Sequence, residues 1–414
     1  MRFNKRLIEN IISLFTIKGM EYILAFITFP YLVRVLQVEN FGAVVFVQSI
    51  IQYFVLFTDY GFNLLGPKEI AQHDSVIERG KIFSSIFFSK LILLFFSTIV
   101  FVIGICGMNF FADVDIRLYA AIYLMVIGNV IFPIWFFQGI QKMRYITIVN
   151  IIARFFSVVG IFYFVQTPND YVLAGFFQAV VPLIAGICSW IILFKSYREV
   201  FVIPQWLDVK RVFIDGWDIF TSTIAINLYT ASNIVFLGML TNNTVVGYFS
   251  GAQKIIQNVN QLIAPITQAV YPYVSKMASE SKEKTLNFLK KMILGLGGGN
   301  LAVSLLIFLF ADPIVRLLLG NGYDESVLLL RILAFLPFII SLSNIFGIQT
   351  MLVFGMKRQF SRTLIEAAVL NTVIVLPLIY FYQGIGVSIS MTVTEIFVTN
   401  AMYCKLRKHN INFF

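Results

Sequence analysis

Three basic residues, Lys18, Arg154 and Lys254, stand inside largely apolar stretches of the chain. A charge at the centre of a membrane costs about 2.5–3.5 kcal/mol, so it normally faces a partner or water. Glu21 and Glu395 stand comparably deep, and Lys18–Glu21 or Lys254–Glu395 pairs are possible. The deep cations outnumber these two acids, which predicts an anionic ligand. Phosphate or pyrophosphate suits the site best, because Arg offers bidentate contacts and Lys a point charge.

Polar residues recur at helical spacing beside these charges. Asn258 and Gln261 follow Lys254 by four and seven residues, and Asn150 precedes Arg154 by four, so each set shares one helix face. The other members of the expected polar lining are Glu21, Tyr22 and Asn227. Two explanations stay open. The stripes either line a water-filled, cationic cavity or form hydrogen bonds between helices of a closed bundle.

The sequence contains few residues that could bind a metal ion or a cofactor. The chain has only two histidines, and its cysteines at 106, 188 and 404 share no short spacing. Asp113-x-Asp115 has the spacing of a glycosyltransferase metal motif, but a solvated loop is the preferred interpretation. We therefore expect no metal site, no cofactor and no catalytic residue.

The composition indicates the elements that position these residues. Apolar residues make up 59% of the 414, charged residues 13% and aromatic residues 16%, with a mean hydropathy of +0.85. These values exclude an ordinary soluble enzyme and intrinsic disorder. Apolar runs of membrane-crossing length predict an all-α integral membrane protein with about twelve transmembrane helices. We expect them near residues 10–33, 41–64, 82–106, 118–140, 147–166, 171–194, 216–240, 244–272, 287–311, 326–353, 362–383 and 385–404.

The distribution of basic residues predicts the orientation. With the N-terminus inside, 23 Lys and Arg residues lie in inner segments and only 3 in outer loops, which follows the positive-inside rule. Both termini are thus expected in the cytoplasm, with Lys90, Arg331 and Glu366 at the edges of spans, their charges reaching toward water. Scattered over seven segments, the basic residues are topology signals, so no nucleic-acid partner is expected despite the net charge of +10.

A weak internal repeat divides the chain. The outer turn Val35–Gly42 resembles Met239–Gly247, each ending in an apolar residue and Gly. The offset is six spans, an even number, so the two halves would share one orientation. We expect an N-terminal six-helix bundle over residues 1–205 and a C-terminal six-helix bundle over residues 206–414.

Several short motifs resemble those of bacterial polysaccharide repeat-unit flippases of the Wzx type. They are Phe29-Pro30-Tyr31-Leu32-Val33-Arg34-Val35-Leu36, Asp59-Tyr60-Gly61-Phe62-Asn63, Pro133-Ile134-Trp135-Phe136-Phe137-Gln138-Gly139 and Val246-Gly247-Tyr248-Phe249-Ser250-Gly251-Ala252-Gln253-Lys254-Ile255. The resemblance covers nearly the whole chain. The superfamily to which these flippases belong also contains multidrug exporters and the peptidoglycan lipid flippase.

The resemblance implies two six-helix bundles around a central cavity that work by alternating access. The implied substrate is an undecaprenyl-pyrophosphate-linked oligosaccharide, moved across the cytoplasmic (inner) membrane for surface polysaccharide such as O-antigen. Lys18, Arg154 and Lys254 match positions where family members often carry cavity cations. A coupling ion (proton or sodium), membrane lipids and the polysaccharide polymerase machinery are possible partners, and Glu21 or Glu395 could serve coupling or pairing. An ion-coupled multidrug exporter is the alternative, and a membrane-embedded polymerase or glycosyltransferase is disfavoured because no large outer loop is present.

Overall fold

The computed structural model describes residues 5–73, 75–107, 115–198, 201–411 and 413. Side chains are described in these ranges except at 5–23, 25, 105–107, 218, 222, 225, 226, 228–231, 264, 265, 268 and 269. Every regular element in the described ranges is helical, and no strand occurs in them. Helices satisfy their own backbone hydrogen bonds, which hydrocarbon demands of any spanning segment. The all-α membrane class is confirmed.

The helices follow one another with short connections. The first half comprises α1 (Lys5–Asp59), α2 (Phe62–Gln72), α3 (Val76–Gly107), α4 (Ile116–Ile131), α5 (Ile134–Gly139), α6 (Met143–Phe164), the 3-10 turn η2 (Pro168–Asp170) and α7 (Tyr171–Ser196). The second half comprises α8 (Trp206–Leu240), α9 (Asn243–Glu280), α10 (Lys282–Met292), the π-helix η4 (Ile293–Gly297), α11 (Gly298–Leu309), α12 (Ala311–Leu318), α13 (Asp324–Leu333), α14 (Leu336–Phe346), the π-helix η5 (Gly347–Leu352) and α15 (Lys357–Lys408).

Each of the twelve expected spans overlaps a helical stretch of this structure. Two of the longest helices are broken, α1 at Gln37 (φ 60°, ψ 178°) and α15 at Gln383 (φ 48°, ψ −125°), so each consists of two legs. Eight helical stretches among the described residues are long and apolar enough to cross a membrane. Two of these eight, Phe26–Gln72 and Lys357–Lys408, contain the breaks. The protein is therefore a multi-pass membrane protein.

Contacts divide the chain into two compact units. Unit 1 comprises Met1–Gly42 and Leu228–Phe414, and unit 2 comprises Ala43–Asn227. The chain passes from one unit to the other within α1 and again within α8. This grouping places the first leg of α1 with the C-terminal half. The division into bundles at residues 1–205 and 206–414 remains a proposal.

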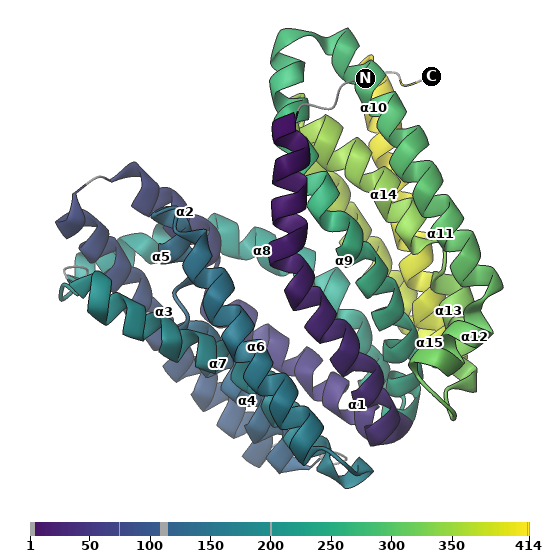
Figure 1. The fold of residues 1–414 in the computed structure, drawn as a ribbon, viewed down its shortest axis with the longest axis horizontal. Helices are drawn as coiled ribbons and strands as arrows, with labels where there is room; N and C mark the ends of the chain where they lie inside the picture. The colour runs from purple at the N-terminus through teal and green to yellow at the C-terminus, as the bar shows by residue number, and fades with distance from the viewer. Residues whose placement is uncertain (1–4, 74, 108–114, 199–200, 412, 414) are drawn as a thin grey trace. The chain divides into compact units, whose positions relative to one another are not determined.

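Contacts between aromatic rings join α3 to α5 in unit 2. The ring of Phe83 on α3 lies 5.3 Å from that of Trp135 and 5.2 Å from that of Phe136, both on α5. Trp135, Phe136 and Phe137 are almost completely buried, which explains an aromatic motif in a segment of only six helical residues. In the same unit α7 packs between α4 and α6 (Figure 1). This packing fixes the face that α6 presents.

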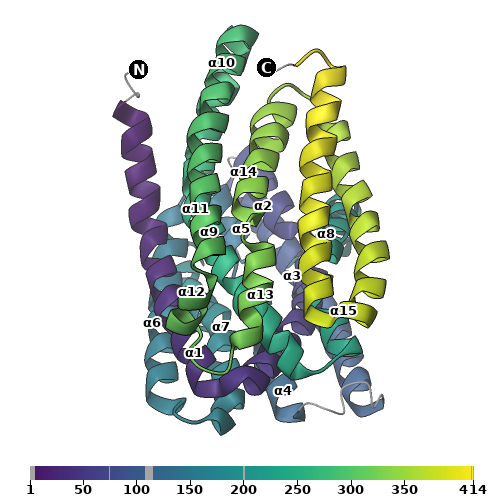
Figure 2. The ribbon, with the colours of Figure 1, turned by 90° about the vertical axis from the view of Figure 1, so that its right-hand side faces the viewer.

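Unit 1 has its own apolar core. Most of its buried side chains come from α9, α10, α14 and α15, and they include Val274, Leu289, Phe346 and Met402. Figure 2 shows these helices and the two legs of α15 running along one another. Asn371 on the first leg donates hydrogen bonds to Ser390 (3.1 Å) and Thr394 (3.2 Å) on the second. Polar contacts between apolar helices hold the pair in register where hydrophobic association alone is not selective.

Candidate functional site

The helix α6 carries Asn150, Arg154 and Ser157 on one face. Ser157 is buried and donates a hydrogen bond of 2.6 Å to the backbone oxygen of Phe177 on α7. This end of the stripe therefore serves helix–helix bonding, as the closed-bundle explanation expects. Asn150 and Arg154 are half-buried, and Arg154 interacts with another group of the chain. Asn150 and Arg154 are thus partly accessible to solvent, and their role in ligand binding stays a prediction.

The polar stripe of α9 lies on an accessible surface. Lys254 and Gln261 are exposed and Asn258 is half-buried, whereas Ala252 and Ile256 are buried in the unit. Lys254 also interacts within the chain. If this stretch of α9 crosses the membrane as predicted from the sequence, an exposed cation with amides is costly against lipid, and the face would meet water or a ligand. The accessible stripe favours the cavity explanation on α9.

Two other lining residues behave differently. Asn227 is half-buried on α8, and its Nδ2 donates to the backbone oxygen of Thr223 at 2.9 Å, a bond within its own helix. Glu395 is half-buried on the second leg of α15, in the same unit as Lys254. The Lys254–Glu395 pair remains a prediction.

The remaining expected residues lie on the first leg of α1. Lys18, Glu21 and Tyr22 fall on helical backbone, but their side chains are outside the described residues. Arg154 belongs to unit 2 and Lys254 to unit 1. Convergence of the three cations on one cavity is therefore a proposal.

The two similar outer turns contact each other within unit 1. A Cβ added to Gly42 would overlap the backbone oxygen of Asn243 and lie 2.8 Å from the backbone nitrogen of Gly247. A Cβ added to Gly247 would in turn overlap the backbone oxygen of Val38. Glycine is required at both positions because the backbones meet directly. Such reciprocity is the contact that a two-fold relation between the turns would produce.

A pocket of about 740 Å³ lies beside this contact. Its lining includes Arg34, Gln37, Thr244, Arg316 and Tyr323. Arg34 donates a hydrogen bond to the backbone oxygen of Leu317, and Tyr323 donates to that of Val33 at 3.3 Å. Burial raises the pKa of Tyr323 above its usual range, so its hydroxyl stays protonated as a donor. These bonds tie the first leg of α1 to the α12–α13 connection.

One charged pair was not anticipated from the sequence. Lys90 on α3 was expected at a span edge with its amine reaching toward water, but only 2% of its side chain is exposed. Its Nζ lies 3.1 Å from a carboxylate oxygen of Asp59, whose side chain is 21% exposed. The expectation for Lys90 was wrong because an acid from the neighbouring helix is in reach. The signal was available, since Asp59 opens one of the family-like motifs and both residues stand near the same predicted side of the membrane.

Of the other two edge charges, Arg331 on α13 is exposed, as expected. Glu366 on α15 is half-buried and forms ion pairs with Arg362 and Lys405, which were not predicted from the sequence. In the Asp113-x-Asp115 motif, Asp113 is outside the described residues. Asp115 caps α4, accepting a hydrogen bond of 2.8 Å from the backbone nitrogen of Arg117. Among the described residues, no group of three His, Cys, Asp or Glu side chains could hold a metal ion.

Comparison with known proteins identifies the family. A family model described as "Polysaccharide biosynthesis protein" matches residues 7–278. The chain belongs to this family. The resemblance drawn from the short motifs is thereby confirmed.

Two relatives within the polysaccharide biosynthesis family match along almost their whole length. A protein of Escherichia coli (strain K12) named "Putative O-antigen transporter" is 37% identical over 409 residues, covering 97% of each chain. A Shigella dysenteriae protein of the same name is 29% identical over 398 residues, covering 94% of this chain and 97% of the relative. Both relatives are named as transporters rather than enzymes, which agrees with the prediction of a transporter from the sequence.

Solved structures share the fold at low sequence identity. The lipid II flippase MurJ in an inward closed conformation matches with a TM-score of 0.73 and 13% identity, covering 95% of this chain and 87% of that one. An inward-facing MATE family multidrug transporter of the MOP superfamily matches with a TM-score of 0.72 and 14% identity, covering 94% and 98%. The chain therefore shares its overall fold with these two solved proteins.

Proposed function

We propose that this protein is a flippase that moves undecaprenyl-pyrophosphate-linked oligosaccharide repeat units across the cytoplasmic membrane for surface polysaccharide assembly. The observation that carries the proposal is membership of the polysaccharide biosynthesis family, and the cations expected at membrane depth support it. Near full-length similarity to a relative named as an O-antigen transporter supports the substrate class. A lipid-linked glycan has an anionic pyrophosphate, a polar sugar chain and an apolar tail, and each part needs its own environment.

The expected cavity cations would bind the pyrophosphate. Lys18, Arg154 and Lys254 supply the positive charge, and the amides Asn150, Asn258 and Gln261 supply donors and acceptors for sugar hydroxyls. A hydrogen bond between charged groups contributes about 1.5–3 kcal/mol. The polyprenyl tail would stay in lipid, where its burial costs nothing.

Transport by alternating access would require the two sides of the cavity to open in turn. The reciprocal contact of the outer turns at Gly42 and Gly247 supports a state in which the outer side is held shut. Opening outward would separate these turns. At these two positions the contact is made by backbone atoms, so the two turns lie as close together as a shut gate requires.

The test is removal of the two cations whose side chains are described. Arg154→Ala and Lys254→Ala, singly and combined, should abolish surface polysaccharide while membrane insertion and protein level stay normal. Lys408→Ala is the matched control, because it removes an exposed cation from the end of α15. Accumulation of lipid-linked repeat units in the deletion strain, measured by mass spectrometry, identifies the blocked step. Normal polymer in the double variant would refute the cationic cavity.

An ion-coupled multidrug exporter is the second candidate, because the fold is shared with a MATE family transporter. On that alternative, deletion of the gene changes drug tolerance and leaves the surface glycan intact. On the flippase proposal the opposite pattern is expected. The flippase proposal includes coupling to protons or sodium through Glu21 or Glu395, and contact with the polymerase machinery. The same deletion strain, complemented with variants, would be used to examine both.

A further inference from the structure

The first leg of α15 presents a face that changes from basic to apolar. Arg358, Arg362, Ile365 and Val369 follow one another at i, i+4, i+7 and i+11, so they share one side of the helix. All four are exposed, Ile365 by 54% and Val369 by 60%. A groove of about 980 Å³ runs along them. By the positive-inside rule the basic end is the cytoplasmic end.

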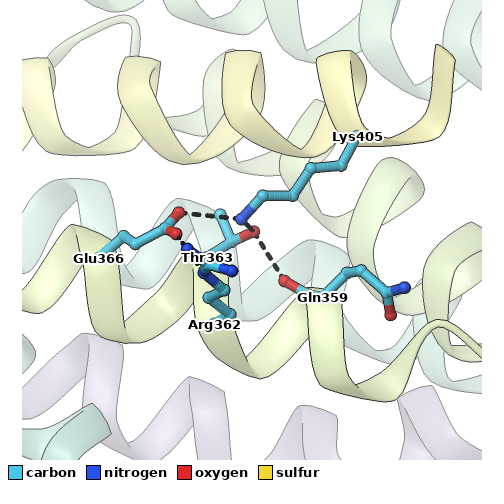
Figure 3. A network of polar contacts seen from close by, with 5 residues as sticks. All are labelled: Gln359, Arg362, Thr363, Glu366 and Lys405. Atoms are coloured by element: carbon cyan, nitrogen blue, oxygen red, sulfur yellow. Dashed lines mark hydrogen bonds and ion pairs between the residues drawn. The ribbon is translucent and has the colours of Figure 1, made fainter. Parts of the chain in front are cut away.

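The basic end of this face has a net positive charge although Glu366 lies beside it. Glu366 accepts from Arg362 Nε at 2.9 Å and from Lys405 Nζ at 2.8 Å, so both of its oxygens are engaged (Figure 3). Lys405 also donates to the Thr363 hydroxyl at 2.8 Å, which ties the second leg of α15 to the first. One carboxylate therefore faces two cations, and the Arg362 side chain is still 76% exposed.

Two more cations complete this end of the groove. Lys357 and Arg358 are exposed in the first turn of α15, and both line the groove. Neither has an ion-pair partner within the described part of the chain. With Arg362 and Lys405 they outnumber Glu366 four to one. The local charge is strongly positive, directly beside an exposed apolar surface.

We infer that this face binds an anionic glycerophospholipid of the inner leaflet. Its phosphate would lie on Arg358 and Arg362, one helical turn apart, and an acyl chain would run along Ile365, Val369 and Val373, the last 65% exposed. Basic clusters at the cytoplasmic side of membrane helices attract anionic headgroups, each Lys or Arg contributing about 1 kcal/mol, a factor of about five. The inference is independent of the flippase proposal, since it concerns a face outside the expected cavity residues.

The test measures lipid binding by the purified full-length protein in detergent. Dioleoyl phosphatidylglycerol is titrated against dioleoyl phosphatidylcholine, which has the same chains but no net charge, and bound lipid is counted by native mass spectrometry. The intact protein should bind phosphatidylglycerol about 25-fold more tightly at low salt, about fivefold for each of the two arginines on its phosphate. Arg358→Gln combined with Arg362→Gln should remove this preference, a loss of about 25-fold at low salt. Arg407→Gln with Lys408→Gln makes the same charge change on the second leg and should bind like the intact protein.

Further variants separate charge, shape and folding. Arg358→Lys with Arg362→Lys keeps the charge and should retain most of the preference, which shows that loss in the Gln variant is not misfolding. Val369→Asn should weaken binding of both lipids, whereas Val393→Asn, also exposed but on the second leg, should not. Equal binding of the two lipids, or an unchanged preference in the Gln variant, would overturn the inference. Displacement by undecaprenyl phosphate far below the phosphatidylglycerol concentration would overturn the choice of occupant, as would competition by inorganic phosphate alone.

Discussion

Lys90 is a charged side chain withdrawn from both water and lipid. With 2% of its side chain exposed, its ammonium depends on Asp59 at 3.1 Å for compensation. Removing one member of a buried pair leaves the other charge uncompensated, which costs about 3–5 kcal/mol, more than the pair itself contributes. The pair links the end of α1 to α3 within unit 2, so it fixes where the second leg of α1 ends.

We predict that Asp59→Asn destabilises the protein more than Lys90→Met. The first change strands a buried ammonium, at a cost of about 3–5 kcal/mol. The second strands a carboxylate that is 21% exposed and can still reach water, so its cost falls below that range. Thermal unfolding of the detergent-solubilised protein gives the two midpoints.

The double variant provides the control for this pair. Asp59→Asn with Lys90→Met has no stranded charge and should unfold at a higher temperature than Asp59→Asn alone. Strict additivity of the two single effects would show that the two side chains do not interact.

The expected ligand-binding residues illustrate what periodicity predicts at this scale. It predicts Arg154 and Lys254 on polar faces, because residues four apart on a helix point the same way. It did not show that Ser157 is turned to α7 while Lys254 is exposed. That distinction depends on which neighbour covers each face.

At the scale of the elements, breaks in helices organise the protein. Helix α8 ends at Leu240, directly before Thr241-Asn242-Asn243, and α15 breaks at Gln383, directly before Gly384. Asn242 caps α9 by accepting from the backbone nitrogen of Val245 at 3.0 Å. Turn residues can be recognised in a sequence because the backbone conformation of a turn depends on the residues of the turn itself. The contact between two such turns, at Gly42 and Gly247, is not local.

We predict that Gly42→Ala disturbs the outer turns. The new methyl group would overlap the backbone of Asn243, which cannot rotate away as a side chain would, so the turns must move apart. Overpacking of this kind costs about 1–3 kcal/mol. The unfolding temperature should fall, and surface polysaccharide in a complemented deletion strain should decrease.

Gly298→Ala is the matched control for that substitution. Gly298 begins α11, and an added Cβ there would have no atom within 4 Å. Alanine in a helix is favoured over glycine by about 0.5–1 kcal/mol, so this variant should be neutral or slightly more stable. A Gly42→Ala variant as stable as Gly298→Ala would contradict direct contact between the turns.

At the scale of the whole molecule, orientation in the membrane decides which end of each helix meets which compartment. The basic residues gather in alternate connections, with only Arg34, Arg117 and Arg316 in the predicted outer ones. Arg34 and Arg316 both line the pocket beside the outer turns. The same rule predicts that the groove beside Arg358 and Arg362 lies at the cytoplasmic end.

Cysteine labelling tests this orientation. In a background with Cys106, Cys188 and Cys404 replaced by Ser, Asn321→Cys should react with a membrane-impermeant maleimide on intact spheroplasts. Ser361→Cys should react only after the membrane is opened. Both positions are exposed, so a difference in labelling reflects sidedness rather than burial. The reverse pattern would invert the topology and move the groove to the outer leaflet.

The sequence by itself determined the class of this protein, the approximate positions of its spans and its family resemblance. Hydropathy, turn chemistry and charge bias act over one or two dozen neighbouring residues, so they can be read along the chain. Only the tertiary structure decided that Lys90 is buried against Asp59, that Gly42 meets Asn243 and Gly247, and that Lys405 joins Glu366. These contacts join residues far apart in the chain. Whether a charge is buried or a glycine is needed depends on the neighbour that packing brings to it.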